Sequence, residues 1–315
     1  MLNSRDMTFP AISLSKIREL DLSAASAAGC PLHLSAASGL VGLNAFIYVV
    51  ADDELHLGVF SAEDRKPGHL IRLFDGALPE SKLDRKKQKP DFEALTLLPA
   101  YGNYPHGALF ALGSGSTRNR RTGALFGLDA QGALRGSPRS IDLSPILASL
   151  DDEFDDLNIE GAVVTGRELR LFQRGNKRHA ENAIIRFQLS AVLDVLNAGR
   201  AAAIRPSAID PVDLGQIDGI PLCFTDAAAL PEGDMIFTAV AEDTDNAYDD
   251  GVCVGAAVGI VDKGGHLRCL RQLDHAHKVE GVDARMDGDD IKLLLVTDAD
   301  DPDVPACLFG ATLKR

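Results

Sequence analysis

Short apolar segments recur along the chain and are separated by polar turns rich in Gly, Asp and Pro. Many are rich in β-branched or aromatic residues, which is typical of buried strands. The segments fall into five groups and keep the same order within each group. Second segments span 45–51, 108–112, 169–173, 235–240 and 291–297, and third segments span 55–60, 123–129, 182–189, 256–262 and 306–313. Fourth segments span 69–74, 139–143, 208–214 and 266–273, so the last group lacks one.

The first segment of each group opens with a short repeated pattern: an acid, a small residue and an apolar residue. The acids are Glu93, Glu160, Asp226 and Glu280, and Ser38 opens a weaker fifth copy. These positions lie 54 to 67 residues apart. An internal repeat of this length indicates a repeat architecture in which each copy forms one structural unit.

Four-stranded units at regular spacing predict an all-β fold, a five-bladed β-propeller that occupies residues 1–315 as a single domain. The alternating segment 14–22 supplies the strand that the last group lacks, and we expect it to close the last blade. A sixth blade is the alternative, built from segments 144–157 and 190–203. Both segments have a helical pattern, and we interpret them as insertions. The chain has no Trp, which excludes the WD40 class.

The amino-acid composition limits the classes of partner that the protein is expected to bind. The 315 residues carry a formal net charge of −14 and a sequence pI near 5.0. A nucleic-acid footprint and an anionic membrane surface both need a basic protein, so neither is expected as a partner. A small neutral or cationic ligand or a metal ion suits the charge better, and whether the partner is a small molecule or a protein stays open. The five cysteines form no CxxC pair, and no secretory signal or apolar span is evident, so we expect a cytoplasmic protein.

Propeller topology predicts where polar groups gather. The first strand of each blade begins at the face where the second strand ends, so the repeated acids should meet the residues that follow the second strands. Concave mouths of this kind favour ligands. The candidate ligand-binding residues are Glu93, Glu160, Asp226, Glu280, Arg118, Arg120, Arg174, Asn176, Glu242, Asp298 and Arg285. The basic loop 79–90 is interpreted as a solvated connection.

Three interpretations of the repeated acids remain open. Glu93, Glu160, Asp226 and Glu280 could hold a divalent cation such as Ca²⁺, which takes six to eight oxygen ligands. They could bind a ligand without a metal. They could also be structural, accepting backbone N–H bonds or pairing with arginines to tie blades together. Segment 242–251 resembles a calcium loop but lacks its spacing.

Several distinctive segments resemble a family of bacterial proteins catalogued only as a domain of unknown function. They are LFALGSGSTRNRR (109–121), DLNIEGAVV (156–164), LFQRGN (171–176), FTDAAALPEG (224–233), AEDTDNAYDDG (241–251), KVEGVDAR (278–285) and LLVTDADDP (294–302). The chain is more distantly similar to esterase-like, phytase-type propellers, whose blades also open with Glu-Gly. This resemblance implies a bacterial β-propeller and carries no established catalytic residues.

Three functions therefore stay open. The first is binding of a small ligand or cation at the acidic mouth without turnover. The second is a metal-assisted hydrolase of esters or phosphoesters. In this case the cation polarises the substrate and Arg118, Arg120 and Arg174 hold its anionic group. The third is a platform for protein interaction through the outer faces of the blades.

Overall fold

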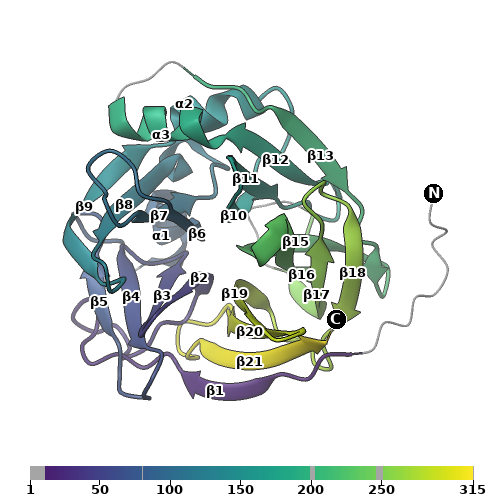
Figure 1. Ribbon diagram of the computed structural model, residues 1–315. Coiled ribbons are helices and arrows are strands. Elements are labelled where there is room, and N and C mark those ends of the chain that lie inside the picture. The colour runs from purple at the N-terminus through teal and green to yellow at the C-terminus, as the bar shows by residue number, and fades with distance from the viewer. Residues whose placement is uncertain (1–10, 80, 199–202, 246–250, 315) are drawn as a thin grey trace.

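The computed structural model describes residues 11–79, 81–198, 203–245 and 251–314. Five small antiparallel sheets are arranged around a central axis as the blades of a β-propeller (Figure 1). The all-β class and the five blades of the sequence prediction are confirmed. No helix among the described residues is long and apolar enough to cross a membrane.

The strands of each blade follow the chain order, except that the N-terminal strand forms the outer edge of blade 5. Blade 1 comprises β2 (Ala37–Leu43), β3 (Phe46–Ala51), β4 (His56–Ser61) and β5 (His69–Arg72). Blade 2 comprises β6 (Phe92–Leu98), β7 (Ala108–Gly113), β8 (Thr122–Leu128) and β9 (Leu134–Asp142). Blade 3 comprises β10 (Ile159–Thr165), β11 (Glu168–Gln173), β12 (Asn182–Gln188) and β13 (Ala208–Val212).

Blade 4 has a fifth, two-residue strand at the start. It comprises β14 (Gln216–Ile217), β15 (Ile220–Ala229), β16 (Met235–Asp243), β17 (Val252–Val261) and β18 (Leu267–Gln272). Blade 5 comprises β19 (Val279–Asp287), β20 (Asp290–Thr297), β21 (Cys307–Lys314) and β1 (Ser15–Glu19). The N-terminal strand β1 pairs antiparallel with the C-terminal strand β21, as the missing fourth segment predicted. This pairing covers an edge that would otherwise be free.

The hydrophobic core lies between the blades, in five clusters that each join two neighbours. At the seam of blades 3 and 4, Phe224 packs edge-on against both Phe172 and Phe237, with ring centroids 5.1 and 5.0 Å apart. Edge-to-face contacts at this spacing are favoured by the ring quadrupole. Each blade therefore depends on its two neighbours for burial of its apolar faces.

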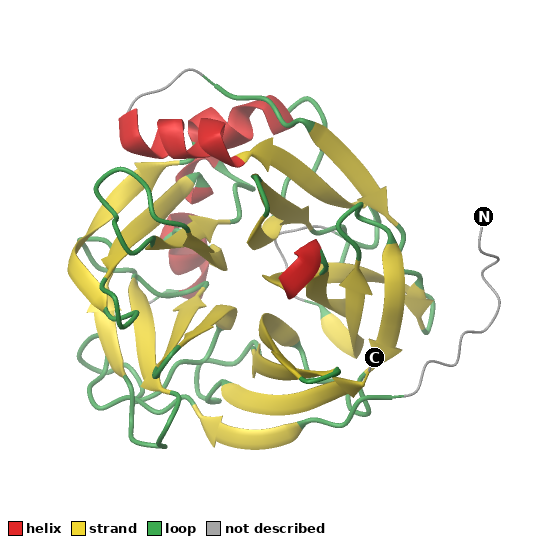
Figure 2. Cartoon of the chain, viewed as in Figure 1, coloured by secondary structure: helices red, strands yellow, loops and turns green. Residues whose placement is uncertain are grey.

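Three short α-helices and three 3-10 helices interrupt the strands of the described chain (Figure 2). α2 (Ser144–Leu147) and α3 (Leu189–Ala198) pack on the core between blades 2 and 3, which confirms that 144–157 and 190–203 are insertions rather than a sixth blade; residues 199–202 lie outside the described chain. α1 (Lys82–Gln88) lies in the basic segment 79–90. The solvated interpretation of this segment is wrong at its end, because Lys89 is only 8% exposed.

Candidate functional site

Every blade carries a β-bulge in the first of its long strands, near the start of the strand in blades 1, 2, 3 and 5 and in the middle of β15 in blade 4. The extra, unpaired residues are Ser38, Glu93, Glu160, Thr225 and Glu280, as the breaks in strand pairing show. A bulge turns its extra residue out of the ladder and so re-aims the side chain. The repeat therefore places three glutamates and two hydroxyl residues at equivalent positions, rather than four acids.

This register corrects the sequence alignment of blade 4 by one residue. Asp226 falls at the position that is Gly39, Ala94, Gly161 and Gly281 in the other blades. In blades 3 and 5 the backbone of the next blade comes close to this position and leaves little room for a side chain. A Cβ on Gly161 would lie 3.0 Å from the backbone nitrogen of Ala227, and one on Gly281 would lie 3.0 Å from the carbonyl oxygen of Ser38.

The Asp226 side chain accordingly reaches into the neighbouring blade. Its Oδ2 accepts a hydrogen bond from the backbone N–H of Val282 at 2.8 Å, and the residue is fully buried. Burial raises the pKa of Asp226 well above its usual value, although backbone hydrogen bonds from Val282, Ala227 and Leu40 oppose the shift. The carboxyl group thus joins blades in the way that the structural interpretation of the acids expects.

The channel mouth is the end of the central axis at which the innermost strands begin. It holds a cavity of ≈ 610 Å³, within the size range of ligand pockets. Eight of the candidate residues line this cavity: Glu93, Glu160, Glu280, Arg120, Arg174, Asn176, Glu242 and Asp298. Asp226, Arg118 and Arg285 are not among its lining residues. Arg118 is exposed, and Arg285 lies 3.5 Å from Asp283 farther along β19.

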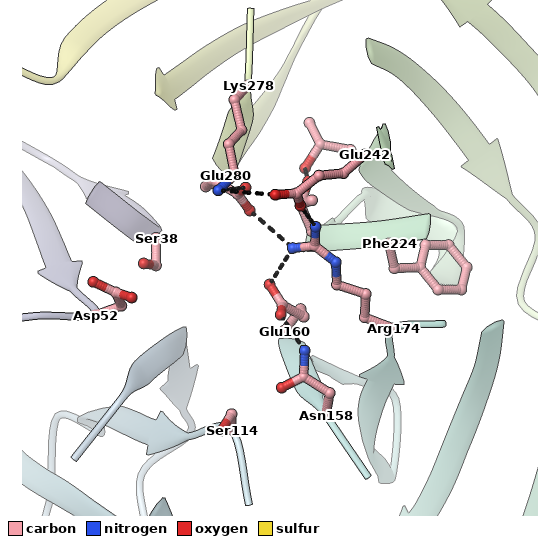
Figure 3. Close-up of polar contacts among 12 residues, drawn as sticks. Ser38, Asp52, Ser114, Asn158, Glu160, Arg174, Phe224, Glu242, Lys278 and Glu280 are labelled. Carbon is pink, nitrogen blue, oxygen red and sulfur yellow. Dashed lines mark hydrogen bonds and ion pairs between the residues drawn. The ribbon is translucent and has the colours of Figure 1, made fainter. Parts of the chain in front are cut away.

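On one side of the cavity, Arg174 and Lys278 are shared by three glutamates; we call these five residues the Arg174 cluster (Figure 3). Arg174 Nη1 lies 3.3 Å from Glu160 Oε2 and 3.7 Å from Glu280 Oε2, and Nη2 pairs with Glu242. Lys278 Nζ lies 3.7 Å from both Glu242 and Glu280. Burial lowers the pKa of Arg174, but the three carboxylates outweigh burial and raise it well above its usual value.

On the opposite side, Lys89 pairs with Asp52 and lies 2.9 Å from Asp91 Oδ1; we call these three residues the Lys89 cluster. Arg120 Nη1 lies 2.8 Å from Asp91 Oδ2, and the Ser114 hydroxyl donates to the same oxygen at 2.6 Å. Burial lowers the pKa of Lys89, but the Asp52 and Asp91 carboxylates outweigh burial and raise it. Lys89 is therefore charged and neutralises these acids.

Glu93 stands between the two clusters. No hydrogen bond or ion pair joins its carboxyl group to any residue within 11–79, 81–198, 203–245 and 251–314. Burial raises the pKa of Glu93 well above its usual value, and the negative charges of Glu160, Asp91 and Asp52 add to the shift. Asp298 is similar: burial raises its pKa to about 8, and within the described chain it has no ion pair. The mouth therefore contains two carboxyl groups that make no ion pair among the described residues, although the nearby charges of Lys89 and Lys278 oppose the two pKa shifts.

Sequence reasoning missed Lys89, Asp91, Asn158 and Lys278, which all face the cavity. Three of them share a signal: Asp91, Asn158 and Lys278 each stand two residues before a bulged glutamate. Because side chains alternate along a strand, residues two apart share a face. Asn158 Nδ2, for example, donates to Glu160 Oε1 at 2.6 Å. Lys89 carried no such signal, since it belongs to the loop after α1.

The family model described as "Family of unknown function (DUF6929)" matches residues 33–313. The chain belongs to this family. The resemblance to a family of unknown function is thus confirmed, and the match covers every bulge of the channel mouth.

The chain is also similar to solved structures. One is a luciferin-regenerating enzyme, with 11% identity, coverage of 96% of this chain and 95% of that one, and a TM-score of 0.48. A B. megaterium levansucrase mutant has 10% identity, coverage of 98% and 92%, and a TM-score of 0.47. A GH43 β-1,3-galactosidase has 9% identity, coverage of 95% and 95%, and a TM-score of 0.47. At these values the likeness gives no argument about a substrate. No curated protein matches the chain.

Proposed function

We propose that the protein is a ligand-binding β-propeller whose channel mouth binds a positively charged group of its ligand. One observation carries this proposal: Glu93 faces the cavity without a hydrogen bond or ion pair among the described residues, whereas its equivalents Glu160 and Glu280 are paired with Arg174. A ligand cation beside Glu93 provides the missing counter-charge and lowers the pKa of that carboxyl group.

The surroundings of Glu93 support a cation over an anion. Arg174, Lys89 and Lys278 are each bound to two or more carboxylates, so they offer little to an anionic ligand. The acids that line the cavity outnumber the bases, and the whole chain carries a net charge of −14. A cleft lined by one sign of charge concentrates ligands of the opposite sign.

Isothermal titration calorimetry tests this function. The probes are Nα-acetyl-arginine amide and its neutral isostere Nα-acetyl-citrulline amide. We expect binding of the arginine probe alone, and at least tenfold weaker binding to Glu93→Gln, because a hydrogen bond to a charged group contributes about 1.5–3 kcal/mol. Asp289→Asn is the matched control, since it removes one exposed carboxylate at the far end of blade 5. Equal binding of the two probes contradicts the proposal.

A metal-assisted hydrolase of esters or phosphoesters is the second candidate. One carboxylate oxygen each from Asp52, Asp91 and Glu93 lies within 4.8 Å of the others, a grouping that could hold a cation. A bound cation there polarises a substrate oxygen and lowers the pKa of bound water. The Lys89 ammonium contacts two of the three acids and competes for the same place. A thermal melt separates the candidates: a midpoint that falls with EDTA and recovers with Ca²⁺ or Mg²⁺ favours the hydrolase.

A further inference from the structure

The described residues include four exposed large hydrophobic side chains: Leu32, Leu83, Val252 and Val304, with exposures of 58%, 70%, 74% and 41%. We call these four the apolar rim. Single exposed apolar residues are common on proteins. What distinguishes these four is that each belongs to a segment at the channel mouth, and none belongs to the described turns at the opposite end.

The connection of each rim residue to the cavity follows from its neighbours. Leu32 and Val304 directly follow Pro31 and Asp303, which line the cavity. The two loops touch, because His33 Nε2 lies 3.1 Å from the carbonyl oxygen of Pro302.

The other two rim residues belong to two separate segments of the mouth, one between blades 1 and 2 and one in blade 4. Leu83 lies in α1, whose Arg85 and Lys86 line the cavity. Val252 follows Gly251, whose backbone N–H donates to Glu242 Oε1 at 2.7 Å. An acidic cavity thus carries apolar side chains on several of its surrounding loops.

From this juxtaposition we propose that the ligand is part of a polypeptide: an arginine or lysine side chain of a protein partner enters the cavity, and apolar residues beside it pack on the apolar rim. This inference rests on the proposed function, because it identifies the molecule that carries the positively charged group. Charge complementarity supports a basic partner, since the acids that line the cavity outnumber the bases and the chain carries a net charge of −14. A free small cation would leave the apolar rim exposed to water. In a polypeptide, an apolar residue next to the arginine or lysine can be buried against the rim, and this burial adds affinity.

Two probes separate the carriers in calorimetry: Nα-acetyl-arginine amide and the acetylated, amidated peptide Leu-Leu-Arg-Leu-Leu. We expect the peptide to bind at least tenfold more tightly than the arginine amide, since burying even one leucine suffices for this factor. The double variant Leu32→Ser, Val304→Ser should lose about tenfold of the peptide affinity and keep the affinity for the arginine amide. Gln131→Ser, an exposed neutral residue in the β8–β9 turn at the opposite end, should change neither.

Each failure has a distinct meaning. If the arginine amide binds and the peptide binds no more tightly, the carrier is a small molecule and the polypeptide proposal is wrong. The same holds if the double variant binds the peptide as tightly as the parent does. If neither probe binds, the proposed function fails and this inference falls with it.

Discussion

Arg174 of blade 3 and Glu280 of blade 5 lie on either side of blade 4, and their side chains come within 3.7 Å at the channel mouth. The same guanidinium also contacts Glu160 of blade 3 and Glu242 of blade 4 (Figure 3). One buried cation thus joins three consecutive blades. Buried ion pairs of this kind are costly to break from one side, because the remaining charges stay buried without a partner.

We expect Arg174→Gln to lower the free energy of unfolding by about 3–5 kcal/mol, the usual loss when one partner of a buried pair is removed. Urea denaturation measures this loss. Lys177→Gln is the control, because Lys177 pairs with Asp243 on the surface, where a pair contributes less than about 1 kcal/mol. Similar losses in the two variants would show that the Arg174 cluster does not tie the blades together.

Lys89 leads to a prediction about metal binding. Its ammonium group contacts Asp52 and Asp91, two of the three acids that could together hold a cation. We expect millimolar Ca²⁺ to leave the melting temperature of the parent protein unchanged. In Lys89→Gln the acids lose their internal cation, so Ca²⁺ should raise the melting temperature by a few degrees through binding to the native state. A thermal melt with Ca²⁺ and then with EDTA provides the measurement.

A Ca²⁺-dependent melt of the parent protein would instead mean that the metal displaces Lys89, in favour of the hydrolase. The matched control for Lys89→Gln is Lys66→Gln, which removes one exposed lysine. It should melt equally with and without Ca²⁺.

The sequence predicts the fold well because each blade has the same local pattern of apolar residues, and this pattern can be recognised without knowing the tertiary contacts. Even the closure by residues 14–22 follows from counting strands. The alignment of blade 4 failed for a specific reason: Asp226 matched the other acids by charge, whereas Phe224 matches Phe92, Ile159 and Val279 by burial. Because apolar burial sets strand register, the apolar residue before the bulge was the more reliable guide.

The contacts between side chains in the site are harder to predict from the sequence than the fold is. The contact between Arg174 and Glu280 depends on the position of blade 5 relative to blade 3 around the propeller axis. No local sequence pattern specifies this position. Lys89 belongs to a highly charged segment whose composition is typical of solvated loops. Its burial arises because α1 ends at Gln88 and directs the chain into the acidic cavity.

Asp298 makes the stability of the protein depend on pH. Burial raises its pKa from 3.8 to about 8, and nearby Asp52 and Asp300 add to the shift against the opposing charge of Lys278. Between these two pH values the folded state binds a proton that the unfolded state does not, so stability falls as pH rises through this window.

Asp298→Asn should remove this contribution and keep the acceptor for the backbone N–H of Asp300, which lies 2.7 Å away. We expect the stability of the variant relative to that of the parent to increase by at least about 1 kcal/mol between about pH 5 and about pH 9. Urea denaturation at both pH values tests this. Parallel pH profiles for the two proteins would contradict the raised pKa.

The different roles of Asp226 and Glu93 predict opposite outcomes for their variants. Asp226→Ala removes the acceptor of the Val282 N–H and should cost about 1–3 kcal/mol of stability. It should leave the affinity for Nα-acetyl-arginine amide unchanged, because Asp226 does not line the cavity. Glu93→Gln should weaken binding at least tenfold and preserve stability, since Glu93 makes no hydrogen bond or ion pair within the described chain.

Urea denaturation and calorimetry on both variants test the contrast together. If Asp226→Ala lost affinity for Nα-acetyl-arginine amide and kept its stability, Asp226 would belong to the ligand site, as the alignment of the repeated acids predicted. A loss of stability in Glu93→Gln would show instead that the carboxyl group holds the fold. The bulge register predicts neither result, because it turns Glu93 into the cavity and Asp226 into the next blade.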